Sequence, residues 1–141
     1  RAAVPANPVE RSLLPVIPYQ LTLDERPGYL HAKVVGERSP ENAMRCLDEV
    51  YAACVRTGLA NVLLEMAFTG PSLGAPGIFR VIEHASANGA RLGLIAYVEA
   101  SLDGLQRAKF AETVAVNRAV NVRLFEDAAQ AAAWLATAPK R

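Results

Sequence analysis

The sequence has few cysteines, almost no net charge and no long apolar run. Cys46 and Cys54 are the two cysteines among 141 residues, too few for a small scaffold held together by disulfides. The 15 basic residues nearly balance the 14 acidic ones, for a net charge of +1. This balance argues against nucleic-acid binding through a broad basic face. No window approaches about 18 uncharged apolar residues, so we expect no membrane insertion.

The two cysteines belong to one predicted helix. Eight residues of helix rise by roughly 12 Å, which is too far for a disulfide. The spacing is not that of a zinc site, and the sequence offers only His31 and His84 as further ligands. We therefore expect free thiols, no metal, no cofactor and a reducing, cytoplasmic location.

Alanine accounts for much of the apolar character. The apolar fraction is 52%, but 26 residues are alanine. The remaining bulky apolar residues make up about a third of the chain, an ordinary value for a soluble domain. The length fits one domain with a single core. We expect this domain over residues 19–138, with small alanines that let helices pack closely on a sheet.

Residues 1–18 form a proline-rich N-terminal arm in this interpretation. They hold four of the nine prolines, and proline removes backbone donors and blocks helix formation. The arm is either a free tail or a segment that packs on its own or a neighbouring domain. Its apolar side chains for such packing are Leu13, Leu14, Val16 and Ile17.

Apolar periodicity predicts the secondary structure of the remaining chain. Strands are expected over 19–23, 29–35, 62–68, 91–98 and 121–125, and helices over 40–57, 78–88, 101–118 and from 128 onward. Ser39 and Asp127 are expected to cap two of these helices, and Gly58 is expected to end one. The order β-β-α-β-α-β-α-β-α predicts an α/β domain with a mixed, mainly parallel sheet.

The most informative segment is the loop expected over residues 69–77. It joins the carboxyl end of a buried strand to a helix N-terminus, where open α/β sheets bind ligands and where anions are favoured. It lacks both the phosphate-binding loop and the dinucleotide fingerprint. It is either a tight connection or a site for an anion or a partner. The residues in question are the glycines Gly70, Gly74 and Gly77 and the hydroxyl residues Thr69 and Ser72.

Three ionisable side chains are candidates for chemistry. Glu65 interrupts an apolar strand, and a buried carboxylate is costly unless it is paired. It either points into a site or has a partner near the strand end, such as Arg91. His31 and His84 belong to no nucleophile motif, so we expect each to be structural or exposed.

Two segments near the C-terminus have a familiar pattern. They read FAETVAVNRAVNVRLF at 110–125 and AAAWL at 131–135. The chain resembles the SpoIIAA-like branch of the STAS superfamily, and its element order agrees over residues 19–136. The resemblance implies a STAS-type sheet of four to five strands. It also implies phosphorylation-controlled protein binding, as in anti-sigma-factor antagonists, or binding of small or lipid-like ligands.

The resemblance also implies a control point. Regulatory STAS domains carry a phosphorylatable serine at the start of the helix after the third strand, in an Asp-Ser-type motif. Ser72 is the nearest candidate here and Thr69 the second, although no aspartate precedes Ser72. A phosphate on Ser72 would bring roughly −1.5 to −2 charges to a helix N-terminus.

These patterns favour a non-enzymatic, cytoplasmic STAS-like module that binds a protein partner through the 69–77 loop and its helix. The alternative is a carrier of a small apolar or anionic ligand, in a pocket lined by Phe68, Phe79, Tyr97 and Phe110. A third hypothesis is a small enzyme that uses Glu65 and a histidine. We also expect self-association as a homodimer, through the apolar arm or the diffuse helix over 101–118.

Overall fold

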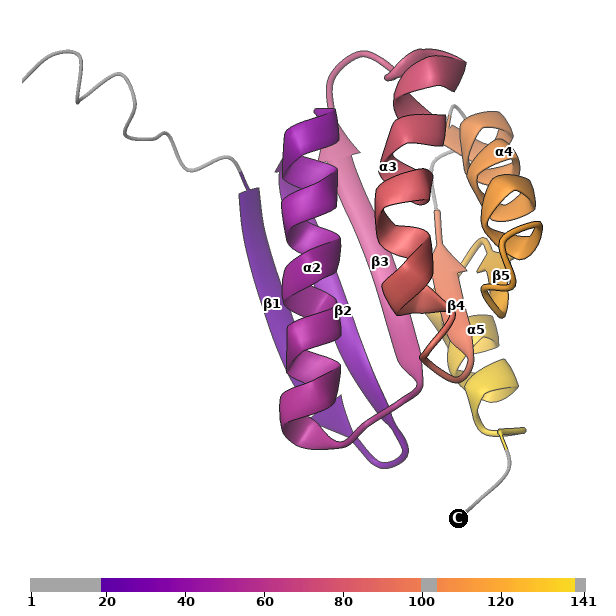
Figure 1. Cartoon of the computed structure of the whole chain (residues 1–141). Coiled ribbons are helices and arrows are strands. Elements are labelled where there is room, and N and C mark those ends of the chain that lie inside the picture. The colour runs from indigo at the N-terminus through magenta and orange to yellow at the C-terminus, as the bar shows by residue number, and fades with distance from the viewer. Residues whose placement is uncertain (1–18, 100–103, 139–141) are drawn as a thin grey trace, which may run out of the picture.

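The computed structural model describes residues 19–99 and 104–138, which form a layered α/β domain (Figure 1). The strands are β1 (Tyr19–Arg26), β2 (Tyr29–Glu37), β3 (Val62–Thr69), β4 (Ile95–Val98) and β5 (Val122–Phe125). The helices are α2 (Pro40–Thr57), α3 (Gly74–Gly89), α4 (Leu105–Val116) and α5 (Ala128–Leu135). The predicted α/β class is confirmed. The predicted arm over 1–18 and the start of the helix predicted over 101–118 lie outside the described residues.

The strands form one mixed sheet of five, in the order β1-β2-β3-β4-β5. β1 and β2 are an antiparallel hairpin, which turns at Gly28 with a φ of +86°. β2, β3, β4 and β5 pair in parallel. The carboxyl ends of these four strands therefore meet at one edge of the sheet, where α/β proteins bind their ligands.

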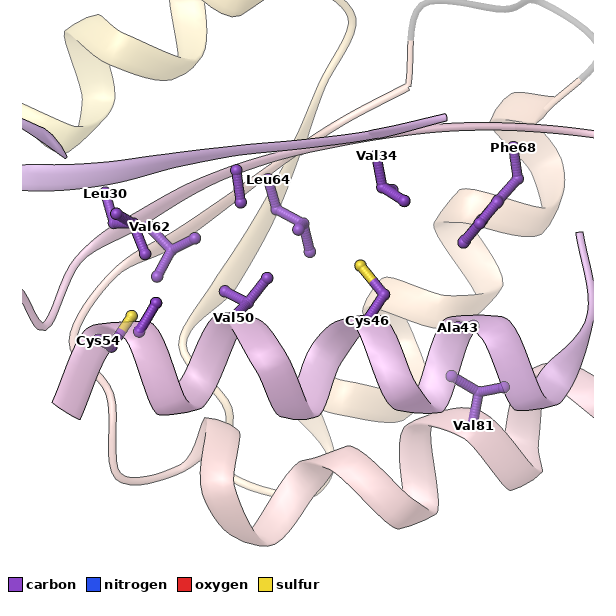
Figure 2. Packing of buried hydrophobic residues seen from close by; sticks show 12 residues of the cluster. Leu30, Val34, Ala43, Cys46, Val50, Cys54, Val62, Leu64, Phe68 and Val81 are labelled. Carbon is purple, nitrogen blue, oxygen red and sulfur yellow. The ribbon is translucent and has the colours of Figure 1, made fainter. Parts of the chain in front are cut away.

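Helices cover the two faces of the sheet unequally. α2, α3 and α4 lie over one face, and α5 lies behind the other (Figure 1). α5 buries Leu135 against Leu63 and Val98. The larger cluster lies beneath α2, whose Cys46 and Val50 point at the sheet (Figure 2). None of the helices in the described ranges is both long and apolar enough to cross a membrane.

The predicted helix caps are confirmed. The Oγ of Ser39 accepts a hydrogen bond of 3.0 Å from the backbone N–H of Asn42 at the start of α2. Asp127 accepts one of 2.8 Å from the N–H of Gln130 at the start of α5. Gly58 ends α2 with a φ of +75°, a left-handed conformation that glycine adopts without strain.

Two predicted boundaries are wrong. α3 begins at Gly74, so residues 74–77 form its first turn and the connection from β3 is shorter than predicted. Pro76 fits this turn because the first N–H groups of a helix have no partner within the helix. β4 begins at Ile95, because the backbone before it folds into turns, with the N–H of Leu92 donating to the carbonyl of Gly89 over 3.0 Å.

Candidate functional site

A cavity of about 180 Å³ lies between the sheet and helices α2, α3 and α4. Its walls are largely apolar and come from strands and helices alike. They include Leu64, Met66, Phe68, Leu73, Ile82 and Ile95. The cavity is partly open to solvent, so a small molecule has a route into it.

Small side chains create this space. Ala85 of α3 and Ala111 and Ala115 of α4 line the cavity. Each presents a single methyl group where a leucine would fill the gap between helix and sheet. The alanine-rich helices thus pack closely on one another and leave room beneath them.

One end of the cavity is polar. Arg38 directly follows β2, Tyr97 lies in β4, Glu99 follows β4, and Arg107 is in the first turn of α4. All four line the cavity at the edge where the parallel strands end. This is the edge at which open α/β sheets bind ligands.

Arg38 is held by backbone carbonyls. Its Nη2 donates to the carbonyl of Phe68 over 2.8 Å, and its Nη1 donates to the carbonyl of Gly70. No carboxylate of the described residues forms an ion pair with it. Burial and the nearby Arg107 guanidinium lower the pKa of Arg38 below its ordinary value, although Glu99 acts in the opposite sense. The arginine is thus a poorly compensated positive charge.

Glu99 and Arg107 lie together around Gly104. A Cβ built on Gly104 would lie 2.6 Å from Oε2 of Glu99 and 3.0 Å from Nη2 of Arg107. Only glycine therefore allows the carboxylate to come so close to the start of α4. Glu99 is 9% exposed, and the adjacent guanidinium offsets the cost of burying its charge.

Tyr97 contributes a hydroxyl to the polar end. Burial, reinforced by the Glu99 carboxylate, raises the pKa of Tyr97 to about 12. The phenol therefore stays protonated at neutral pH and can donate a hydrogen bond. Within the described part of the chain, the hydroxyl has no hydrogen-bond partner.

The hydroxyl residues and glycines predicted as the loop site do not line the cavity, although their neighbour Leu73 does. The Oγ of Ser72 accepts a hydrogen bond of 3.1 Å from the N–H of Gly74, and Ser72 is exposed. Thr69 donates to the carbonyl of Gly36 over 3.3 Å. Gly70 and Gly74 have φ values of +103° and +74°. Gly77 lies within α3, where a Cβ would come within 2.7 Å of Cβ of Leu73.

The four aromatic side chains predicted to line one pocket separate into two pairs. Phe68 and Tyr97 line the cavity. Phe79 on α3 and Phe110 on α4 are instead 45% and 37% exposed. The guanidinium of Arg118 lies 4.7 Å from the centre of the Phe79 ring, a cation–π contact at the surface.

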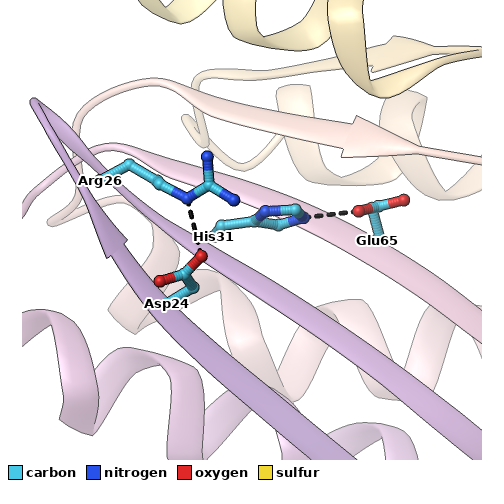
Figure 3. A network of polar contacts seen from close by, with 4 residues as sticks. All are labelled: Asp24, Arg26, His31 and Glu65. Carbon is cyan, nitrogen blue, oxygen red and sulfur yellow. Dashed lines mark hydrogen bonds and ion pairs between the residues drawn. The ribbon is translucent and has the colours of Figure 1, made fainter.

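Glu65 lies on the other face of the sheet and pairs with His31, so the predicted partner Arg91 is wrong. Oε1 of Glu65 lies 2.5 Å from Nε2 of His31, near the ion pair of Asp24 and Arg26 (Figure 3). The pair has the convergence that the enzyme hypothesis requires. Neither member lines the cavity, because side chains alternate between the faces of a strand.

The other histidine bridges two helices. Nε2 of His84 on α3 lies 3.0 Å from Oδ1 of Asp48 on α2. Both side chains are exposed, so this contact joins α2 and α3 at the protein surface. No group of three or more His, Cys, Asp or Glu side chains among residues 19–99 and 104–138 is arranged to hold a metal ion.

Sequence reasoning did not identify Arg38 and Glu99 as site residues. Neither belongs to a motif, and two helices and two strands separate them in the sequence. The available signal was their position, because each directly follows a parallel strand. Collecting the polar residues at strand ends would have placed both at one edge.

Comparison of the chain with protein-family models gave no match, and comparison with curated protein sequences gave none. The interpretation of the site therefore depends on its geometry.

Proposed function

We propose that this chain is a cytoplasmic STAS-like domain that binds a small, mainly apolar molecule in the cavity beneath α3. The observation that carries the proposal is the apolar cavity of about 180 Å³ with polar groups at one end. A cavity of about 150 Å³ in another protein holds benzene. The space here suits a ligand of that size or slightly larger.

The energetics of an empty cavity support this proposal. Unfilled space costs a folded protein about 24 cal/mol per Å³, so 180 Å³ corresponds to at most about 4 kcal/mol. Water in the open part of the cavity reduces this cost. A ligand that fills the apolar part restores the missing contacts and stabilises the folded state by mass action.

The STAS assignment has separate support. The sheet has five strands, within the four to five that the sequence resemblance implies. The resemblance implies two alternative roles, protein binding and ligand binding, and the proposal takes the second.

Binding of 1-hexanol to the purified protein tests the proposal. We expect wild type to bind it in isothermal titration. The variant Ala85→Leu should bind at least tenfold more weakly, because its larger side chain fills the cavity. The matched control is Ala87→Leu, at an exposed position of the same helix. Equal binding by both variants, or no binding by wild type, would contradict the proposal.

A second candidate function is protein binding through the loop after β3 and through α3. It is favoured by the exposure of Ser72 and of the Phe79 ring on neighbouring turns. A phosphate on Ser72 would lie beside the first turn of α3, whose N-cap residue Leu73 makes no side-chain hydrogen bond. Ser72→Asp and Ser72→Ala should change the set of proteins recovered with the domain in opposite directions. An identical set for both variants and wild type would remove this candidate.

A further inference from the structure

The charged side chains that line the cavity are unequally compensated. Asp48 pairs with His84 at 3.0 Å, and Glu112 accepts a hydrogen bond of 2.7 Å from the N–H of Leu124. Arg107 and Glu99 lie on either side of Gly104. Arg38 differs from these because its partners are two neutral carbonyls.

The guanidinium of Arg38 is half-buried and bonded only to carbonyls, so it keeps its full charge. Partial burial of such a charge is unfavourable unless an anion compensates it. Burial and the field of Arg107 lower the pKa of Arg38, and an anion beside it would oppose both effects. The polar end therefore favours a negatively charged group.

The hydroxyl of Tyr97 supplies a second donor at the same end. It lines the cavity, and the charges of Arg38 and Arg107 both act on it. It is protonated at neutral pH and has no partner among the described residues. A ligand oxygen between Arg38 and Tyr97 would satisfy it.

The net charge at this end selects the kind of anion. Among the described residues that line this end, two guanidinium groups and one carboxylate, from Arg38, Arg107 and Glu99, leave one positive charge. One positive charge matches a monoanion. A doubly charged phosphate monoester would be left with an uncompensated charge beside the Glu99 carboxylate.

We infer that the cavity binds a short-chain monocarboxylate, with its carboxylate against Arg38 and the Tyr97 hydroxyl and its hydrocarbon chain beneath α3. The inference rests on the proposed function and adds the head group to it. An apolar cavity of about 150 Å³ holds the six carbons of benzene, so hexanoate is a suitable probe for about 180 Å³.

Hexanoate and 1-hexanol share a six-carbon skeleton and differ in charge. In isothermal titrations at pH 7, we expect wild type to bind hexanoate at least tenfold more tightly than 1-hexanol, because charge-assisted hydrogen bonds are stronger than neutral ones. Arg38→Met should remove this preference and still bind 1-hexanol. Arg38→Lys should retain part of it. Tyr97→Phe should weaken hexanoate binding severalfold.

Arg80→Met is the matched control. Arg80 is an exposed arginine of α3 whose partner is Glu41, 3.5 Å away, and it does not line the cavity. This variant should bind both probes as wild type does. Binding of 1-hexanol by Arg38→Met also shows that the cavity has remained folded.

The outcomes separate the inference from the proposed function. Equal affinity for the two probes in wild type would overturn the anionic head group and leave the apolar cavity as a binding site. An unchanged preference in Arg38→Met would overturn the assignment of Arg38. Binding of neither probe would overturn both the proposed function and the inference.

Discussion

Raising the pH from 9 to 11 is expected to lower the free energy of unfolding by about 4 kcal/mol. The cause is the burial of both thiols beneath α2, which raises the pKa of Cys46 to about 12 and that of Cys54 to about 11. In the unfolded chain each thiol ionises near its ordinary value of 9.0. The native state thus binds more protons over this interval, so its stability is complete below pH 9 and falls above it. Each cysteine contributes about 2 kcal/mol over this interval.

Urea denaturation at pH 8, 9, 10 and 11 measures this loss. The matched variant is Cys46→Ala combined with Cys54→Ala, which should retain most of its pH 8 stability at pH 11. Some loss should remain, because burial also raises the pKa values of Tyr97 and Tyr19. If the free energy of unfolding fell equally with pH in wild type and the double variant, the thiols would have the same pKa in the native and unfolded states. That result would contradict the prediction.

The substitution Leu30→Ala is expected to lower the free energy of unfolding by about 2–5 kcal/mol. Leu30 is 1% exposed on β2. It packs near Val62 and Cys54 between the sheet and α2 (Figure 2). Its removal forfeits buried apolar area and leaves a space that neighbours on two sheet strands and a helix fill only in part.

Urea denaturation at pH 7 measures the effect of Leu30→Ala as a lower midpoint at an unchanged m-value. Val55→Ala is the control, since this valine of α2 is 65% exposed, and it should change stability by less than about 0.5 kcal/mol. A loss below about 1 kcal/mol for Leu30→Ala would mean that the site collapses around the smaller side chain.

The elements that were predictable are those that local chemistry specifies. A serine before Pro40, an aspartate before α5 and a glycine after α2 each act on the adjacent turn, and their roles are as predicted. The start of α3 was not predictable in this way. Its first turn contains two glycines and a proline, a composition that also suits a loop.

The site was less predictable because its contacts are between segments distant in sequence. Periodicity placed Phe68 and Tyr97 on strands, and both line the cavity. It could not orient Phe110, because α4 carries apolar residues around most of its circumference. The partner of Glu65 depends on the register between β2 and β3, which places Lys33 directly opposite it and His31 diagonally. Residue order alone does not specify such a register.

The sheet order β1-β2-β3-β4-β5 has a consequence for biosynthesis. Each strand after β1 pairs with the strand synthesised just before it, and α2 packs on β1 and β2, α3 on α2, and α4 on α3, so that each of these helices packs on elements that precede it in the chain. An emerging segment therefore finds its neighbour already made, and no strand must wait for a later one to be inserted between two others. We expect the nascent chain to add one strand–helix unit at a time, with α5 closing the second face last.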